Sequence, residues 1–496
     1  MEEVEAQRYR FGALERRGVV AGWRGGQVGA LVAGLLTGIG LFRTWPSMAG
    51  ALLALGCLGI AVGAATWPIQ GRTAEEWAPD VIRHVAAWFT RRNLVTSSSP
   101  AAGMTAGPRA SGSALAGGTL GALSILHVGA PGAEVGVLHD LRARTVSAMV
   151  QAAGNGFVLE GPSDRDRQVD MWARVLAASS RETASVHRLA WVARSFPDGA
   201  GSERAHLCRG THLDPSHPAY RSYEDLLESV AVEADRHEVL VLLSVQYGRA
   251  SRPIRAAGGG LAGGVSVLVD ELDALRSRLV SADVETSPPL DAGGVAAAIR
   301  RGYDPVRPHP PGMSGHGASG LRAGGLSPWP MAMKASWEHL RVDSTWHATF
   351  WISEWPRLEV GADVLAPLLV LSGVRRSVAL VMEPFSASAA ARHVEQRRTA
   401  DVADAELRHR GGFLATARRR REEDDLARQE AELAEGQALV RYSGYVTVTT
   451  SSLEELAAAC EKVEQVAALS GLELRRCYGD QAGAFSYTLP LGRGLR

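Results

Sequence analysis

The stretch from Trp23 to Trp67 reads WRGGQVGALVAGLLTGIGLFRTWPSMAGALLALGCLGIAVGAATW, and it decides the architecture of the amino-terminal part. Three tryptophans, Trp23, Trp45 and Trp67, stand at equal intervals of 22 residues. A helix of that length spans roughly 33 Å, close to the hydrocarbon thickness of a bilayer, and Trp prefers the two membrane interfaces. The spacing predicts a transmembrane hairpin with Trp23 and Trp67 at one interface and Trp45 at the other.

The two predicted spans, Gly25 to Phe42 and Met48 to Thr66, contain no charged residue. A buried helix pair of a soluble protein is the alternative, and two adjacent uncharged stretches of this length disfavour it. A signal peptide fits poorly because a second span follows at once. Arginines flank both outer ends, whereas Arg43 alone lies in the turn, so the positive-inside rule places both termini in the cytoplasm. The sequence therefore predicts a two-span protein of the cytoplasmic membrane.

Glycines recur in G-x-x-x-G pairs within both spans. Such pairs let helix backbones approach closely in lipid. The pairs are Gly25 with Gly29, Gly34 with Gly38, and Gly59 with Gly63. Two interpretations stay open: the glycines pack the hairpin on itself, or they keep one face for another membrane protein.

The composition gives little support to a nucleic-acid-binding protein or to a disulfide-stabilised secreted protein. The 496 residues carry 53 basic and 53 acidic side chains, so no overall charge attracts nucleic acid or an acidic surface. The four cysteines lie far apart without a C-x-x-C motif, which suits a reducing cytoplasm and no disulfide framework. Most of the chain is soluble in character, and we expect a largely cytoplasmic protein on a membrane anchor.

The pattern along the chain predicts an α+β fold with several units. Residues 1–96 form the anchor, and residues 97–118, rich in Ser, Ala and Gly, form a flexible linker. Residues 119–300 then mix strand-like and helix-like patterns in a first cytoplasmic domain. A Pro/Gly-rich linker over residues 301–330 precedes a second domain over residues 331–496.

Three segments within these domains have the clearest secondary-structure patterns. Tyr223 to Arg236 is predicted as a helix before a strand. Residues 387–440 are charged and predicted as a helical pair broken at Gly411-Gly412. In residues 445–478 a strand, an amphipathic helix and a return strand follow one another, which predicts a β-α-β unit of a ferredoxin-like sandwich.

Tests for enzymatic motifs fail, and we expect no enzyme and no cofactor. The two lysines, Lys334 and Lys462, follow Met333 and Glu461, so no phosphate-binding G-x-x-x-x-G-K-[ST] loop exists. The G-x-G-x-x-G at residues 258–263 lacks the tight strand-to-helix turn of a dinucleotide site, and we expect an ordinary Gly-rich loop.

Two clusters leave alternatives open. Potential metal ligands crowd into the Arg204 to Pro218 loop, but their spacing matches no common zinc pattern, and a polar loop is expected instead. These residues are His206, Cys208, His212, Asp214 and His217. Arg418 to Arg421 is followed at once by four acidic residues, which favours pairing along a solvated helix over nucleic-acid binding.

Several stretches resemble known families. Arg8 to Gly18 (RYRFGALERRG), Gly22 to Gln27 (GWRGGQ) and Trp67 to Trp77 (WPIQGRTAEEW) are similar to the membrane hairpin of the PrgI family, which belongs to Gram-positive conjugation and type IV secretion-like machines. Trp346 to Arg357 (WHATFWISEWPR), the charged helical pair, and Val446 to Gly492 resemble the amino-terminal domain of VirB/TraC-type secretion ATPases. As a whole, the chain is similar to a family of actinobacterial integral membrane proteins.

The resemblance implies a non-enzymatic platform in a conjugation-like or type IV secretion-like apparatus. The ATPases continue into a P-loop domain where this sequence ends, so a separate P-loop ATPase and other membrane subunits are the implied partners, and a homo-oligomer is also compatible. Trp346, Trp351, Trp355 and Arg357 are the residues expected to dock the partner. The alternative function is a membrane-tethered nucleic-acid-binding protein.

Overall fold

The computed structural model describes most of the chain. The described residues are 9, 11, 25–66, 73–91, 93–96, 123–129, 134–154, 160–197, 207, 211, 213–231, 235–305, 329–356, 358–410 and 417–495. The predicted linker over residues 97–118 and most of the one over residues 301–330 lie outside these ranges.

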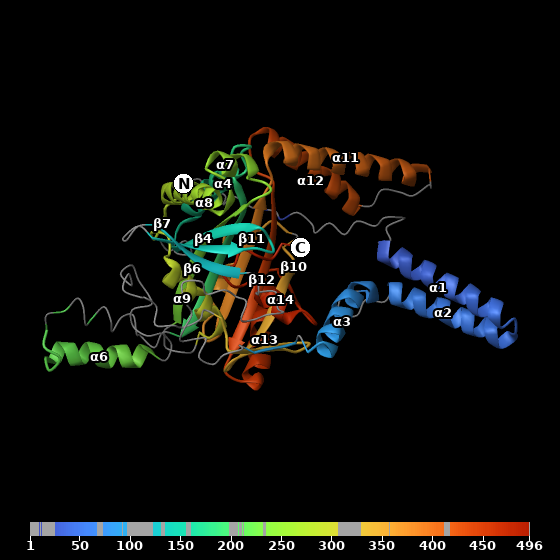
Figure 1. The fold of residues 1–496 in the computed structure, drawn as a ribbon, viewed down its shortest axis with the longest axis horizontal. Helices are drawn as coiled ribbons and strands as arrows, with labels where there is room; N and C mark the ends of the chain where they lie inside the picture. Colours follow the sequence, from blue (N-terminus) through green and yellow to red (C-terminus); the bar gives the residue numbers. More distant parts are fainter. Residues whose placement is uncertain are drawn as a thin grey trace, which may run out of the picture.

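An apolar helical hairpin projects from an α+β body (Figure 1), which confirms the predicted fold class. Helices α1 (Gly25–Thr44) and α2 (Met48–Thr66) form the hairpin. Helix α3 (Ala74–Phe89) follows and begins at a capping box of Thr73 and Glu76. The short strand β1 (Leu94–Thr96) then joins the edge of the sheet in the body.

The body contains one antiparallel sheet of 13 strands, to which two parts of the chain contribute in turn. The first part contains β2 (Leu123–Val128), β3 (Val135–Asp140), β4 (Thr145–Gly154), α4 (Pro162–Ser179), β5 (Val186–Pro197), α6 (Pro218–Ala231), β6 (Asp235–Gln246), α7 (Ser251–Ala256), α8 (Gly260–Ser281), β7 (Val284–Thr286) and α9 (Ala292–Tyr303). The second part contains β8 (Ala332–Ala335), β9 (Leu340–Val342), β10 (Thr345–Glu354), α10 (Ala366–Leu369), β11 (Arg376–Pro384), α11 (Ala387–Arg410), α12 (Ala417–Ala434), β12 (Val440–Thr450), α13 (Leu453–Leu469), β13 (Glu473–Arg476) and α14 (Gln481–Phe485).

The two parts repeat the same strand pairing. In the first part the sheet runs β7-β4-β6-β5, and in the second it runs β13-β10-β12-β11. Both are the order of a β-α-β-β-α-β ferredoxin-like unit, and each carries a preceding two-stranded extension, β2-β3 or β8-β9. The predicted β-α-β unit at the end of the chain is therefore half of one of two similar units.

The two units join edge to edge. Strand β5 pairs antiparallel with β11 from Leu189 opposite Met382 to Ser195 opposite Arg376. The division into two cytoplasmic domains stays a prediction of the sequence, and the strands on both sides of it share one hydrogen-bonded sheet.

Strand β6 explains why the sheet needs cover on both faces. Leu240 and Leu242 point into a core that includes α9, whereas Val241 and Leu243 point into a second core that includes α8. A third core lies between β10, β12 and α13. Because side chains alternate across a strand, the continuous apolar run of β6 fits a strand buried on both faces.

Two predicted elements differ from the structure or fall outside it. The helix predicted over Tyr223 to Arg236 is wrong in its bounds, because α6 ends at Ala231 and Arg236 pairs with Phe196 in the sheet. Tertiary pairing there overrides the helical spacing. The predicted charged helical pair corresponds to α11 and α12, and its Gly411-Gly412 break lies outside the described residues.

Candidate functional site

The apolar hairpin presents hydrophobic side chains to its surroundings. Leu55 and Ile60 are 73% and 74% exposed, although buried positions are usual for such residues. By length and composition, Gly26–Thr44 could cross a membrane, and Met48–Gly63 is a shorter apolar stretch. A contiguous apolar surface of this kind marks a membrane or an interaction site.

The glycines of the hairpin divide into two groups. A Cβ atom built on Gly34 would lie 2.3 Å from the Cβ of Ala61, and one on Gly38 would lie 3.2 Å from a backbone oxygen of α2. The first pair therefore allows α1 to approach α2 closely. Cβ atoms on Gly59 and Gly63 would meet no described atom within 4 Å, so this second pair lies on an open face of α2.

Of the three predicted interface tryptophans, the structure describes one. Trp45 lies in the turn between α1 and α2 and is 63% exposed, and its place at a membrane interface stays a prediction. Trp23 and Trp67 lie outside the described residues.

An aromatic cluster attaches α3 to the body. The ring of Trp77 stacks on that of Trp337 at 5.7 Å, and both rings lie near Tyr478. The ring of His84 meets Trp337 edge-on at 5.1 Å. Gly479 has a φ of 74°, and a Cβ there would lie 2.7 Å from the ring of Trp337, so the turn after β13 needs glycine.

The segment before the hairpin also contacts the body. Tyr9 forms an antiparallel bridge with Val360, and its hydroxyl donates to Asp166 at 3.1 Å. The ring of Phe11 lies 4.9 Å from that of Trp355. The body therefore contacts the chain on both sides of the hairpin.

Helix α3 also carries exposed apolar side chains. Ile82, Val85 and Phe89 lie on a side of the helix turned away from Trp77, and Trp88 is exposed near the end of the helix. An amphipathic helix with such a face is typical of a helix in a membrane interface.

Three of the four predicted docking residues lie among the described residues, and they occur along and just after β10. Trp346 and Trp355 are half-buried near opposite ends of β10 and pack against the third core. Trp351 donates from its indole nitrogen to the hydroxyl of Ser443 at 3.1 Å. Arg357 lies outside the described residues.

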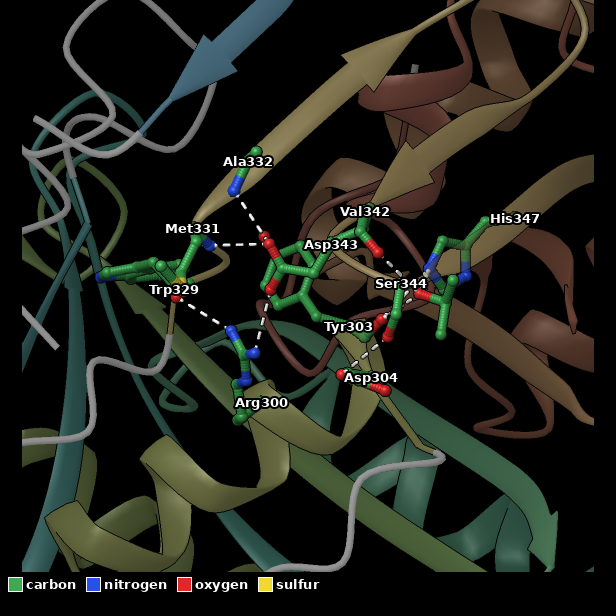
Figure 2. A network of polar contacts seen from close by, with 11 residues as sticks. Arg300, Tyr303, Asp304, Trp329, Met331, Ala332, Val342, Asp343, Ser344 and His347 are labelled. Atoms are coloured by element: carbon green, nitrogen blue, oxygen red, sulfur yellow. Dashed lines mark hydrogen bonds and ion pairs between the residues drawn. The ribbon is translucent and has the colours of Figure 1, made fainter. Parts of the chain in front are cut away.

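A polar network, partly buried around Asp343 and fully buried around His347, connects the end of α9 to the β8–β10 strands (Figure 2). Arg300 donates to Asp343 at 2.9 Å and to the carbonyl oxygen of Trp329 at 3.1 Å. The second carboxylate oxygen of Asp343 accepts from the amides of Met331 and Ala332. Asp343 itself adopts a left-handed φ of 47°, a conformation that Asp tolerates better than most residues.

His347 is the centre of the second half of this network. Its Nε2 lies 2.9 Å from the hydroxyl of Thr345 and 3.1 Å from the carbonyl oxygen of Tyr303, and its Nδ1 lies 2.9 Å from the hydroxyl of Thr449. Burial lowers the pKa of His347 to about 3, so the ring is neutral at physiological pH. Both ring nitrogens have protein partners in the core, which suits a structural role better than proton exchange with a substrate.

A buried ion cluster fixes α9 on the other side. Glu238 of β6 lies 2.5 Å from Arg301 and 3.7 Å from Arg194, and Arg194 also donates to the carbonyl oxygen of Ala298 at 2.6 Å. Burial lowers the pKa of Arg194 to about 10, and Glu238 opposes this shift. Buried charges of this kind require their partners, so the cluster holds α9 against β5 and β6.

The predicted metal loop is described in part. Asp214 accepts hydrogen bonds from Ser216, and His217 accepts one from the amide of Ala219, so both make local turn contacts. His206, Cys208 and His212 lie outside the described residues. Within the described ranges, no three His, Cys, Asp or Glu side chains group as a metal site. The side chains of Arg418–Arg421 are also outside, and nucleic-acid binding there stays a prediction.

One comparison with known proteins gives a match. Residues 233–352 match the family model described as "Putative type VII ESX secretion system translocon, EccE". No curated protein matches the chain. The matched segment runs from β6 into β10 and contains all the residues labelled in Figure 2.

The family match covers a shorter stretch of the chain than the resemblance described from the sequence, and it names a different type of secretion system. It supports similarity to a membrane-associated component of a secretion system, which the apolar helices fit. It names type VII, whereas the sequence resemblance named the type IV-like PrgI and VirB/TraC families. Over residues 233–352, the chain is similar to a type VII secretion translocon component.

Proposed function

We propose that this protein is a membrane-anchored structural component of a type VII-like secretion translocon. The observation that carries the proposal is an exposed apolar hairpin whose flanking segments both contact the body that contains the EccE-like segment. Such attachment would hold the body close to the membrane instead of on a free tether.

In this proposal α1 and α2 both cross the cytoplasmic membrane, and the two termini lie in the cytoplasm. The excess of arginine outside the hairpin supports this orientation. Helix α3 would lie in the membrane interface, with its apolar side toward lipid and its aromatic side toward Trp337.

The body would act as a scaffold without catalysis of its own. Both ring nitrogens of His347 have protein partners, and Glu238 forms an ion pair with Arg301, which favours a structural role for these residues. Docking of a separate P-loop ATPase is the second part of the proposal, and it rests on the likeness of Trp346 to Arg357 and the last β-α-β unit to ATPase amino-terminal domains. Because Trp346 and Trp351 are half-buried, docking would use their exposed edges.

The test is affinity purification of the tagged full-length protein from gently solubilised native membranes, with mass spectrometry of its partners. A tagged, unrelated two-span protein is the control. Recovery of other type VII membrane subunits together with a P-loop ATPase is expected. Recovery of the subunits without the ATPase would refute the docking part alone, and recovery of neither would refute the translocon role.

A further inference from the structure

A cluster of basic side chains lies at one end of the seam where β5 of the first unit pairs with β11 of the second. It contains His187 and Arg188 on β5, Arg249 just after β6, and Arg441 on β12, all around Glu383 of β11. We call these five residues the seam cluster. Because both units contribute, the cluster exists only when the two are joined.

The cluster contains more positive than negative charge. Arg441 lies 2.8 Å from the carboxylate of Glu383, and Arg188 lies 3.7 Å from the same oxygen. Arg249 donates a hydrogen bond to the carbonyl oxygen of Pro384 at 2.9 Å. A carbonyl oxygen is uncharged, so this bond does not neutralise the charge of Arg249. Among the described residues, one carboxylate thus faces three guanidinium groups.

The charged groups nearby leave this excess in place. Glu182 also attracts Arg249 electrostatically. Its carboxylate, however, accepts a hydrogen bond from the amide of Ser388 and attracts Arg392 as well. With this second pair included, the part of the chain that the structure describes places four arginines against two carboxylates. Buried or half-buried cations normally have matching anions, since an unbalanced charge is costly away from water.

Two polar nitrogen atoms in the cluster lack hydrogen-bond partners. Nε of Arg188 and Nδ1 of His187 are both buried without one, and the His187 side chain is 8% exposed. Its Nδ1 lies 3.8 Å from Glu383, beyond hydrogen-bonding distance. Buried polar atoms in native proteins are nearly always satisfied. Nε of Arg188 is always a donor, and the neutral His187 ring can place its proton on Nδ1, so both can donate to one bound acceptor.

We propose that the seam cluster binds a phosphate group. Arginine forks match phosphate oxygens geometrically, and a tetrahedral anion offers acceptors to several donors at once. The side chain of Arg441 is 50% exposed, so the anion can enter from solvent at this residue. A bound phosphate would bridge the two units at their seam, which adds a ligand to the scaffold role proposed above and does not depend on it.

The test is isothermal titration of the full-length protein in a neutral detergent, at low salt and pH 7, with inorganic phosphate and with AMP. Saturable binding of phosphate is expected. A higher affinity for AMP would identify a nucleotide as the source of the phosphate, and equal or lower affinity would identify the free ion.

Variants separate this site from adventitious binding. Arg441→Gln and Arg249→Gln should each weaken binding at least tenfold, whereas Glu383→Gln should strengthen it several-fold because its carboxylate no longer competes for the arginines. Arg167→Gln, at an exposed arginine of α4, is the matched control and should change nothing. Circular dichroism verifies that each variant is folded. Absence of saturable binding, or equal affinities in all folded variants, would overturn the proposal.

Discussion

His347 gives the protein a stability that depends on pH. It is fully buried in the sheet, and its neighbours in the network are hydroxyl groups and a backbone carbonyl, with no carboxylate among those contacts. Burial therefore keeps its folded-state pKa at about 3, far below the ordinary value of roughly 6.5 that it regains on unfolding.

The magnitude follows from this difference. Because the unfolded chain binds the proton more readily, the stabilisation is fully present above about pH 6.5 and is lost as the pH falls toward 3. A pH of 5 is about 1.5 units below the pKa of His347 in the unfolded chain, so the unfolded residue is protonated there. The folded residue is still neutral at this pH. At about 1.4 kcal/mol per unit, the loss between pH 7 and pH 5 is about 2 kcal/mol.

The assay is guanidinium unfolding of the full-length protein in detergent micelles at pH 7 and at pH 5, followed by tryptophan fluorescence. Between pH 7 and pH 5, the free energy of unfolding of the wild type should fall by about 2 kcal/mol more than that of His347→Asn. Other titrating groups, including His187, whose pKa burial lowers to about 4, cancel in this difference. Equal losses in the wild type and His347→Asn would refute the reasoning.

Three further predictions concern the anchor. Gly34→Val should lower the thermal midpoint in micelles by overpacking α1 against Ala61, at a cost of roughly 1–3 kcal/mol, whereas Gly59→Val on the open face should not. Trp337→Ala removes the ring contacts with Trp77 and His84 that bind α3, together about 1–3 kcal/mol, and should speed tryptic cleavage between α3 and β1. In intact cells, Trp45→Cys should react with an impermeant maleimide, and Arg398→Cys on the exposed side of α11 should not.

Each of these predictions has a contrary outcome. Equal midpoints for the two glycine variants would mean that Gly34 does not set the approach of the helices. Unchanged cleavage of Trp337→Ala would mean that other contacts hold α3. Labelling of Arg398→Cys in intact cells would place the body outside the cell and reverse the proposed orientation.

The local elements could be predicted because their signals are local. The uncharged runs between Trp23, Trp45 and Trp67 indicate the hairpin, and the cap, helix and strand pattern after Tyr445 indicates the final β-α-β unit. The joining of two units in one sheet could not be predicted, since it depends on pairing between β5 and β11, which lie far apart in the sequence. Their apolar stretches are consistent with central strands, but they do not specify a partner.

The polar network was also missed, although a signal exists. Thr345, His347 and Thr349 occupy alternate positions of β10, and Thr447 and Thr449 do so on β12, so polar side chains share one face of two paired strands. That alternation predicts a polar layer. It does not predict that the layer is buried, which requires α9 and α14 to cover it.

The measurement that tests the central claim most directly is the secreted proteome of a deletion strain. We expect a defined set of proteins to disappear from the culture medium and to return with the full-length protein, but not with a variant that lacks residues 25–66. Unchanged secretion in the deletion strain, or full rescue without the hairpin, would contradict a membrane-anchored role in translocation.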